Sequence, residues 1–162
     1  MMPTSPSPAG AAPAPDTAGR RAAMGLLARA ETAEIAAGLA VVADPLRYVE
    51  LRPVATGLVM LRGRIGGDGA PFNLGEATVT RAAVRMESGE VGFSYLLGRD
   101  QTKARLAAVC DALWQREASR AAVEQHVLAP IKARLGRECA EKRSEAAATR
   151  VDFFTLVRGE DE

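Results

Sequence analysis

Two kinds of hydrophobic spacing occupy separate blocks of the chain, and this segregation restricts the fold more than any other feature. Apolar residues three or four positions apart predict helices over residues 20–43 and again from about residue 100. The block between them alternates apolar and polar residues around turn signals, which is typical of strands. Because the two kinds are grouped and do not alternate, the sequence predicts an α+β fold and not a doubly wound parallel sheet. Its expected order is N-terminal helices, central antiparallel β-hairpins, C-terminal helices and a final strand.

The central block divides at its turn residues. The stretch LRYVELRPV predicts an edge strand interrupted by Pro53, and GLVMLRGRI predicts a second strand. The glycine-rich run GGDGAPFN indicates a wide hairpin turn, although its backbone amides could also form an anion nest. Finally, ATVTRAAVRM and VGFSYLL flank ESGE and predict a hairpin with a short loop.

Helix boundaries are indicated by caps and by one proline. Thr32, Asp100 and Ser119 are each placed to cap a helix, and Pro130 is expected at the first position of a new one. The first 19 residues carry five of the nine prolines and almost no large aliphatic side chains. Such a segment cannot bury enough apolar surface to offset its ordering entropy. We therefore expect residues 1–19 to be a disordered tail and residues 20–162 to be one domain.

Charge and composition narrow the classes of function. The formal net charge is +1, which does not favour a nucleic-acid partner. No stretch is apolar over the roughly 18 residues that a membrane span requires, and the N-terminus lacks the pattern of a signal peptide. A cytoplasmic protein with no membrane partner is expected. The two cysteines, Cys110 and Cys139, are expected to be reduced and to hold no metal.

Arg81 and Arg85 are the most informative charged residues. If ATVTRAAVRM is a strand, their even spacing places both on one face with Ala77, Val79 and Ala83. A face that is half apolar and half cationic suits a subunit interface or an anion site, whereas scattered arginines facing solvent remain the alternative. Arg64 and Arg99 could add to the same positive surface.

The apolar segment VDFFTLV near the C-terminus is predicted to be a strand with apolar side chains on both faces. Phe153, Phe154 and Leu156 are therefore candidate interface residues, covered either by another chain or by the same domain's sheet. A catalytic role is not indicated for His126, since no nucleophile elbow accompanies it. We expect no catalytic residue and no cofactor on this chain.

The order of several motifs resembles a known family. The run GLVMLRGRIGGDGAPFNLGEATVTRAAVR, then GFSYLLGRD, then RVDFFTLVRGE is similar to the G subunit of the bacterial carbon–phosphorus lyase system. The resemblance covers about residues 21–160. It depends on TRAAVR, LGRD and RVDFFT together, because no single motif is specific.

The resemblance implies a role in phosphonate utilisation. In that family the G subunit joins H, I and J subunits, and the I subunit is the expected direct contact of this chain. With H, I and an L protein, G takes part in displacing adenine from ATP by a phosphonate, which gives an alpha-D-ribose 1-phosphonate 5-triphosphate. ATP would then be a substrate of the complex, and this chain would be one subunit of a multi-subunit enzyme. A non-catalytic scaffolding or regulatory protein, or an independent nucleotide-binding domain, are the alternatives.

Overall fold

The computed structural model describes residues 16–43, 45–66 and 68–149. Two helices, α1 (Thr17–Arg29) and α2 (Thr32–Val42), precede three strands, β1 (Tyr48–Arg64), β2 (Pro71–Met86) and β3 (Val91–Leu97). The helices α3 (Gln101–Gln115), α4 (Glu117–Val123) and α5 (Ala129–Ala148) follow, with a π-helical turn at Glu124–Leu128 between the last two. The predicted α+β order of helices, antiparallel strands and helices is confirmed. The predicted final strand, with Phe153, Phe154 and Leu156, lies outside the described residues.

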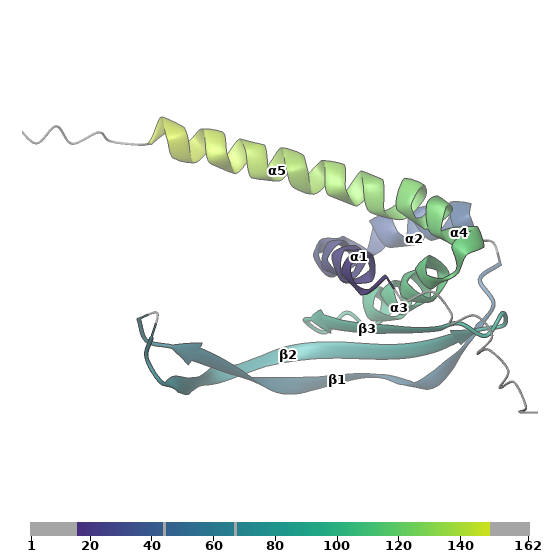
Figure 1. Cartoon of the computed structure of the whole chain (residues 1–162), viewed down its shortest axis with the longest axis horizontal. Helices are drawn as coiled ribbons and strands as arrows, with labels where there is room; N and C mark the ends of the chain where they lie inside the picture. Colours follow the sequence, from purple (N-terminus) through teal and green to yellow (C-terminus); the bar gives the residue numbers. More distant parts are fainter. Residues whose placement is uncertain (1–15, 44, 67, 150–162) are drawn as a thin grey trace, which may run out of the picture.

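The strands form one antiparallel sheet in the order β1-β2-β3, and the helices pack on one of its faces (Figure 1). On β2, the side chains of Ala82, Val84 and Met86 face this helical layer and belong to the core. The opposite face of the sheet carries no layer among the described residues. The fold is therefore a two-layer arrangement with one open sheet face.

Helix α3 is the centre of the core. Nine of its residues are buried, including Ala104, Ala107, Ala108 and Ala112. These short side chains let the backbone of α3 approach β3 closely, and Gly92 is placed where a Cβ atom would lie 1.9 Å from the carbonyl oxygen of Ala108. The apolar residues of α1 and α2, such as Leu27, Ile35 and Leu39, cover α3 from the other side.

The predicted caps were partly right. Asp100 caps α3, because its carboxylate accepts the backbone N–H of Lys103 at 2.8 Å. Thr32 is not a cap: α2 begins after Glu31, whose N–H donates to the carboxylate of Glu34, and the Thr32 hydroxyl instead donates to Asp100. The predicted cap at Thr32 was therefore wrong, and the hydroxyl of Thr32 binds the carboxylate of Asp100 instead.

The C-terminal helices also differ in detail from the prediction. Ser119 lies inside α4 and donates its hydroxyl hydrogen to the carbonyl of Leu113. Pro130 is the second residue of α5, one position later than predicted, and α5 directly follows the π-helical turn. A wider turn before a proline accommodates its missing N–H and its ring.

The strand prediction was wrong about β1 and about the start of β2. Instead of two strands, β1 is one long strand, and register shifts occur between Glu50 and Arg52 and between Arg52 and Ala55. These irregularities flank Pro53, which an edge strand accommodates because the proline has no N–H to donate. β2 begins at Pro71, so β1 and β2 form a hairpin that extends beyond β3 (Figure 1).

The N-terminal boundary also differs from the expected one. Helix α1 begins at Thr17, after Asp16 accepts the backbone N–H of Gly19 at 2.8 Å. Residues 17–19, assigned to the tail by their composition, are therefore part of a capped helix. None of the described helices combines the length and the apolar character needed to cross a membrane.

Candidate functional site

The open face of the sheet carries arginines and aromatic rings in adjacent rows. In the register of the sheet, Arg81 on β2 lies between Ala55 on β1 and Tyr95 on β3. The next row along holds Arg52, Ala83 and Phe93. Directly paired residues in an antiparallel sheet project on the same side, with Cβ atoms about 5 Å apart. The structure thus brings cations and aromatic rings together on one surface.

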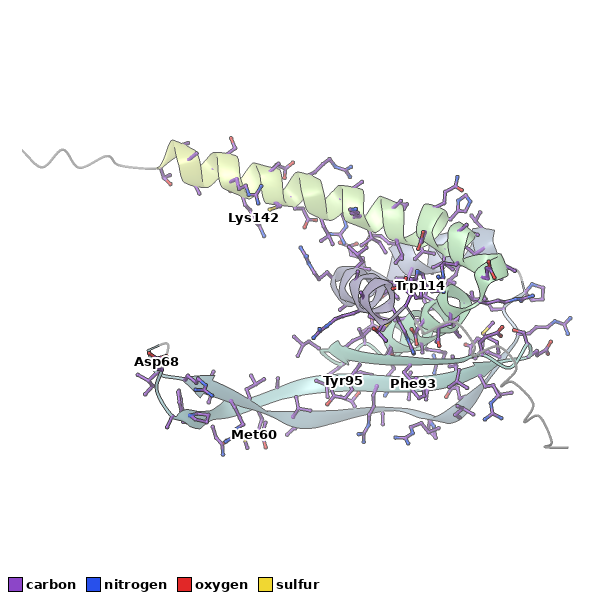
Figure 2. All side chains as sticks on the ribbon, in the orientation of Figure 1. Met60, Asp68, Phe93, Tyr95, Trp114 and Lys142 are labelled. Atoms are coloured by element: carbon purple, nitrogen blue, oxygen red, sulfur yellow. The ribbon has the colours of Figure 1, made fainter. Side chains whose placement is uncertain are left out.

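A groove of about 470 Å³ lies where this surface meets helix α1. Its aromatic side chains, Phe93 and Tyr95, are 54% and 56% exposed (Figure 2). The groove is lined by residues of all three strands and of α1 and α3: Arg20, Met24, Arg52, Arg81, Ala82, Ala83, Phe93, Ser94, Tyr95 and Asp111. Its size is within the range of small-molecule sites.

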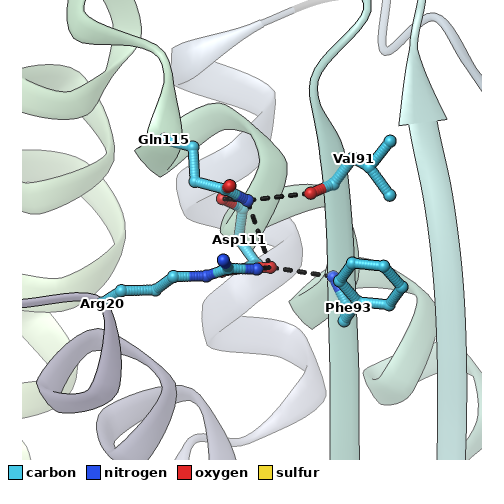
Figure 3. Close-up of polar contacts among 5 residues, drawn as sticks. All are labelled: Arg20, Val91, Phe93, Asp111 and Gln115. Carbon is cyan, nitrogen blue, oxygen red and sulfur yellow. Dashed lines mark hydrogen bonds and ion pairs between the residues drawn. The ribbon is translucent and has the colours of Figure 1, made fainter. Parts of the chain in front are cut away.

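One wall of the groove is fixed by a buried carboxylate (Figure 3). Asp111 on α3 is 2% exposed and accepts both Nε and Nη2 of Arg20, at 2.7 and 2.6 Å. The same carboxylate accepts the backbone N–H of Phe93 at 2.8 Å. The hydrogen bond to Asp111 raises the pKa of Arg20 above its ordinary value. Helix α1, helix α3 and strand β3 are therefore connected through one ionised group.

The same contacts protect part of the edge of β3. The carbonyl oxygen of Val91 accepts Nε2 of Gln115 at 2.9 Å, and the N–H of Phe93 is bound by Asp111 (Figure 3). Backbone groups that face outward from an edge strand otherwise attract a strand of another chain. Side chains of α3 thus bind the backbone groups of Val91 and Phe93 in the first half of this edge. Tyr95 and Leu97 lie outside the protected half.

Arg52, Arg81 and Arg85 carry the positive charge of the open face. All three are exposed, and the described residues provide none of them with an ion-pair partner. Arg85 lies between Val49 and Val91 in the register, one row beyond Phe93. The shared face predicted for Arg81 and Arg85 is confirmed, whereas their role as an anion or partner site stays a prediction.

A second surface was not foreseen from the sequence. The part of the β1–β2 hairpin that extends beyond β3, residues 58–66 and 68–78, is called the arm below. Alternate residues of a strand face opposite sides, so Leu58 and Met60 lie on one face of the arm and Leu61 on the other. Exposed large apolar residues occur along its whole length: Leu58, Met60, Leu61, Ile65, Phe72 and Leu74. Figure 2 shows Met60 and Asp68 on this projecting part of the hairpin.

Comparison with known proteins identifies the family. The model of the family described as "Phosphonate metabolism protein PhnG" matches residues 18–159. The chain belongs to the PhnG family. It is also 54% identical, over 142 residues, to a protein of Rhizobium meliloti (strain 1021) named "Alpha-D-ribose 1-methylphosphonate 5-triphosphate synthase subunit PhnG". The matched region covers 88% of this chain and 90% of that relative. The family suggested by TRAAVR, LGRD and RVDFFT is confirmed.

Three of the four arginines predicted for the site do not line the groove in this PhnG-family chain: Arg85, which shares the open face with Arg81, and also Arg64 and Arg99. Arg64 pairs with Pro71 at the far end of the hairpin. Pro71 lies ten positions before Arg81 on β2, so the two residues are separated by roughly 33 Å along the strand. Its guanidinium donates to the carbonyl of Gly69 in the turn. Arg99 follows β3 and is exposed, but it does not line the groove. Residues that the sequence did not indicate, Arg20 and Arg52, take their place.

The remaining candidates of the PhnG-family chain do not line the groove. The glycine-rich run forms the turn of the arm, where Gly66 has a positive φ of 55° and its carbonyl accepts the N–H of Gly69. Cys110 is fully buried, and burial raises the pKa of its thiol to about 12. His126 lies in the π-helical turn, half-buried. Among the described residues, no three His, Cys, Asp or Glu side chains gather as metal ligands would.

Proposed function

We propose that this chain is the PhnG subunit of an alpha-D-ribose 1-methylphosphonate 5-triphosphate synthase that acts in phosphonate metabolism. The observation that carries the proposal is the 54% identity to the R. meliloti subunit over 88% of this chain and 90% of the relative. The family match over residues 18–159 supports the same assignment.

The reaction attached to this family explains why a cationic subunit is useful. A phosphonate oxygen attacks C1′ of ATP, the bond from C1′ to N9 of adenine breaks, and the departing adenine takes up the proton that the phosphonate monoanion loses. Both reactants are anions, so they repel each other unless positive charge lies close to them. Arg52, Arg81 and Arg85 supply such charge, and the nucleophile is the substrate's own oxygen. The proposed contribution of this chain is charge and surface, without a catalytic residue or a cofactor of its own.

The open sheet face and the arm support a function inside a complex. A soluble protein that works alone seldom presents a large apolar surface, and such surfaces usually mark binding sites for other proteins. The exposed residues of the arm, together with Val49 and Leu97 on the sheet, form surfaces of this kind. The proposed partners are the H, I and J subunits, with the I subunit in direct contact. The complex would be cytoplasmic.

Reconstitution tests the proposal. The H, I and L proteins are purified with and without this chain and are incubated with ATP and methylphosphonate. Adenine and the ribose 1-methylphosphonate 5-triphosphate are then separated and quantified by liquid chromatography. Both products are expected together only when this chain is present. Equal rates of both products without it would contradict the proposal.

A purely scaffolding role is the second candidate, and the uncovered sheet face favours it. The variants Arg81→Ala and Arg85→Ala distinguish a scaffolding role from direct contact with substrate. If the variants assemble and the KM for ATP rises, the side chain contacts substrate. If assembly is lost, the arginine faces a partner carboxylate. If neither changes, both arginines face solvent and the open face is not a cationic site. An independent nucleotide-binding domain would instead bind ATP as the isolated chain.

A further inference from the structure

We propose that the open face of the sheet binds an acidic, amphipathic helix of another subunit of the synthase. The carboxylates of that helix would lie on Arg52, Arg81 and Arg85, and its apolar side chains would lie over Phe93 and Tyr95. This inference rests on the proposed function and deepens it, because it names the chemistry of the partner. It assigns the arginines to the carboxylates of a partner and not to the substrate.

The positive charge of the open face is concentrated and unpaired. Arg85, Arg52 and Arg81 occupy three successive rows of this face, and neighbouring rows are about 7 Å apart along the strands. The other members of these rows, none of them acidic, are Val49, Ala55, Ala83, Val91, Phe93 and Tyr95. No ion pair to any of the three arginines occurs within residues 16–43, 45–66 and 68–149. Carboxylates of a partner would remove the repulsion between these guanidinium groups.

An apolar column runs beside the arginines. Phe93, Tyr95 and Leu97 project from alternate positions of β3, and they are 54%, 56% and 76% exposed. Rings and aliphatic chains in such positions contribute binding free energy when another protein removes them from water. Because a column of cations lies beside a column of apolar residues, the partner surface needs acidic and apolar side chains next to each other.

A helix is the form of partner that suits a sheet face. The helices of this chain pack on the other face, and the open face carries no layer among the described residues (Figure 1). A sheet face presents side chains and not free backbone groups, so the segment that covers it must satisfy its own backbone, as a helix does.

The spacing of the arginines also suits a helix. Acidic residues seven or eight positions apart on a helix are about 11 to 12 Å apart along its axis, close to the roughly 13 Å between Arg81 and Arg85. A second copy of this chain is disfavoured as the partner, because its open face would bring arginines against arginines.

Photo-crosslinking identifies the segment that covers this face. p-Benzoyl-phenylalanine is incorporated in place of Tyr95, and the assembled synthase is irradiated, digested and analysed by mass spectrometry. The crosslink is expected on a segment of another subunit whose Asp or Glu residues recur at helical spacing. The same probe in place of Val41, on exposed surface of α2, is the control and should not label this segment. A crosslink to a segment without acidic residues, a crosslink to residues 150–162 of this chain, or no crosslink in an assembled complex would overturn the inference.

Charge reversal measures how strongly the arginines hold the partner. Arg81→Glu and Arg85→Glu each replace an exposed side chain, so the fold should be retained, which circular dichroism verifies. In native mass spectrometry, affinity for the partner subunit should fall by about tenfold or more in each variant, since an attraction becomes a repulsion. Arg21→Glu, exposed on α1, is the matched control and should bind as the wild type does. Replacing the crosslinked acid by arginine should restore the binding of Arg81→Glu.

The outcomes separate this inference from the proposed function. If Arg81→Glu assembles to the wild-type extent and adenine release still requires this chain, the inference is wrong and the proposed function stands. If Arg81→Gln assembles normally and only the KM for ATP rises, the arginine contacts substrate and the inference is again wrong. Equal adenine release without this chain would instead contradict the proposed function, and the binding measurement would still decide the inference.

Discussion

Arg20 and Asp111, 91 positions apart in the chain, form a two-point ion pair in which Nε and Nη2 lie 2.7 and 2.6 Å from the two carboxylate oxygens. Asp111 is almost fully buried, so its charge needs these donors and the N–H of Phe93. The pair connects the first helix to the central helix and to the edge strand that carries the aromatic residues of the groove. Its effect on stability can be measured directly.

Loss of Arg20 should destabilise the fold. Arg20→Ala leaves the buried carboxylate of Asp111 with the N–H of Phe93 and a longer hydrogen bond of 3.4 Å from Gln115, and the expected loss in the free energy of unfolding is about 2 kcal/mol or more. Arg21→Ala removes the same charge from a neighbouring exposed position and should change stability by less than about 0.5 kcal/mol. Urea unfolding followed by circular dichroism gives both values. Equal stability of the two variants would show that the ion pair contributes nothing.

Gly92 should not tolerate a methyl group. In Gly92→Ala, the new Cβ would meet the carbonyl oxygen of Ala108 at 1.9 Å and the amide nitrogen of Ala112 at 2.6 Å, both in the backbone of α3. Separation of β3 from α3 should cost about 3 kcal/mol. Gly57→Ala is the matched control, because this residue also belongs to a strand and its new methyl group would have nothing within 4 Å. Thermal unfolding compares the two, and a Gly92→Ala protein as stable as Gly57→Ala would contradict the close packing.

The ion pair between Glu34 and Arg134 should make stability depend on pH in the acid range. The hydrogen bond from Arg134, at 2.7 Å, lowers the pKa of Glu34 below its ordinary value of 4.5. A carboxyl whose folded pKa is depressed stabilises the fold above its unfolded pKa, and this contribution is lost as the pH falls through the folded pKa. Glu138 also binds Arg134, and Lys103 adds to the positive field at Glu34.

The difference in melting temperature between the wild type and Glu34→Gln reports this contribution. It should be constant above about pH 5.5, where both the folded and unfolded carboxyl are ionised. It should decline progressively below pH 4.5 and vanish once the folded carboxyl is protonated. A difference that grows on acidification would reverse the assigned sign.

The two cysteines should differ strongly in reactivity. Cys110 is fully buried with a pKa of about 12, so little thiolate is present at pH 8, whereas Cys139 on α5 is exposed. Brief treatment of the folded protein with iodoacetamide, followed by peptide mass spectrometry, should show alkylation at Cys139 only. Both residues should react in denaturant. Rapid alkylation of Cys110 in the folded protein would show that α3 is not packed as described.

The parts of this molecule that depend on local periodicity could be predicted from the sequence. The common face of Arg81 and Arg85 follows from their even spacing in a strand, and the cap at Asp100 follows from its place before a helix. The groove could not be predicted in this way. It requires Arg20 and Asp111, which the fold brings together from distant parts of the chain, and Arg52, whose face depends on the irregular register around Pro53.

The exposed apolar surface of the arm could not be predicted from the sequence, for a different reason. The residues Leu58, Met60 and Leu61 have the alternation of an ordinary strand, and that alternation is the same whether a face is buried or exposed. The short length of β3 decides whether these faces are exposed. Strand β3 pairs with Val79–Arg85 of β2, and no other described strand pairs with the rest of the hairpin. Arg64 was assigned to the cationic face for the same reason, since its position along the hairpin depends on where β1 ends.

The arm is proposed to be covered by another subunit of the synthase, and the assembly of this chain with those subunits tests that interface. Met60→Glu and Leu61→Glu are introduced together, so that each face of the arm carries one buried charge in the complex. Native mass spectrometry of the chain expressed with its partner subunits then measures the fraction assembled, and circular dichroism verifies that the fold is retained. Val41→Glu, on exposed apolar surface of α2, is the control. The arm variant is expected to stay folded and to fail to assemble, while the control assembles normally. A folded arm variant that assembles to the wild-type extent would contradict it.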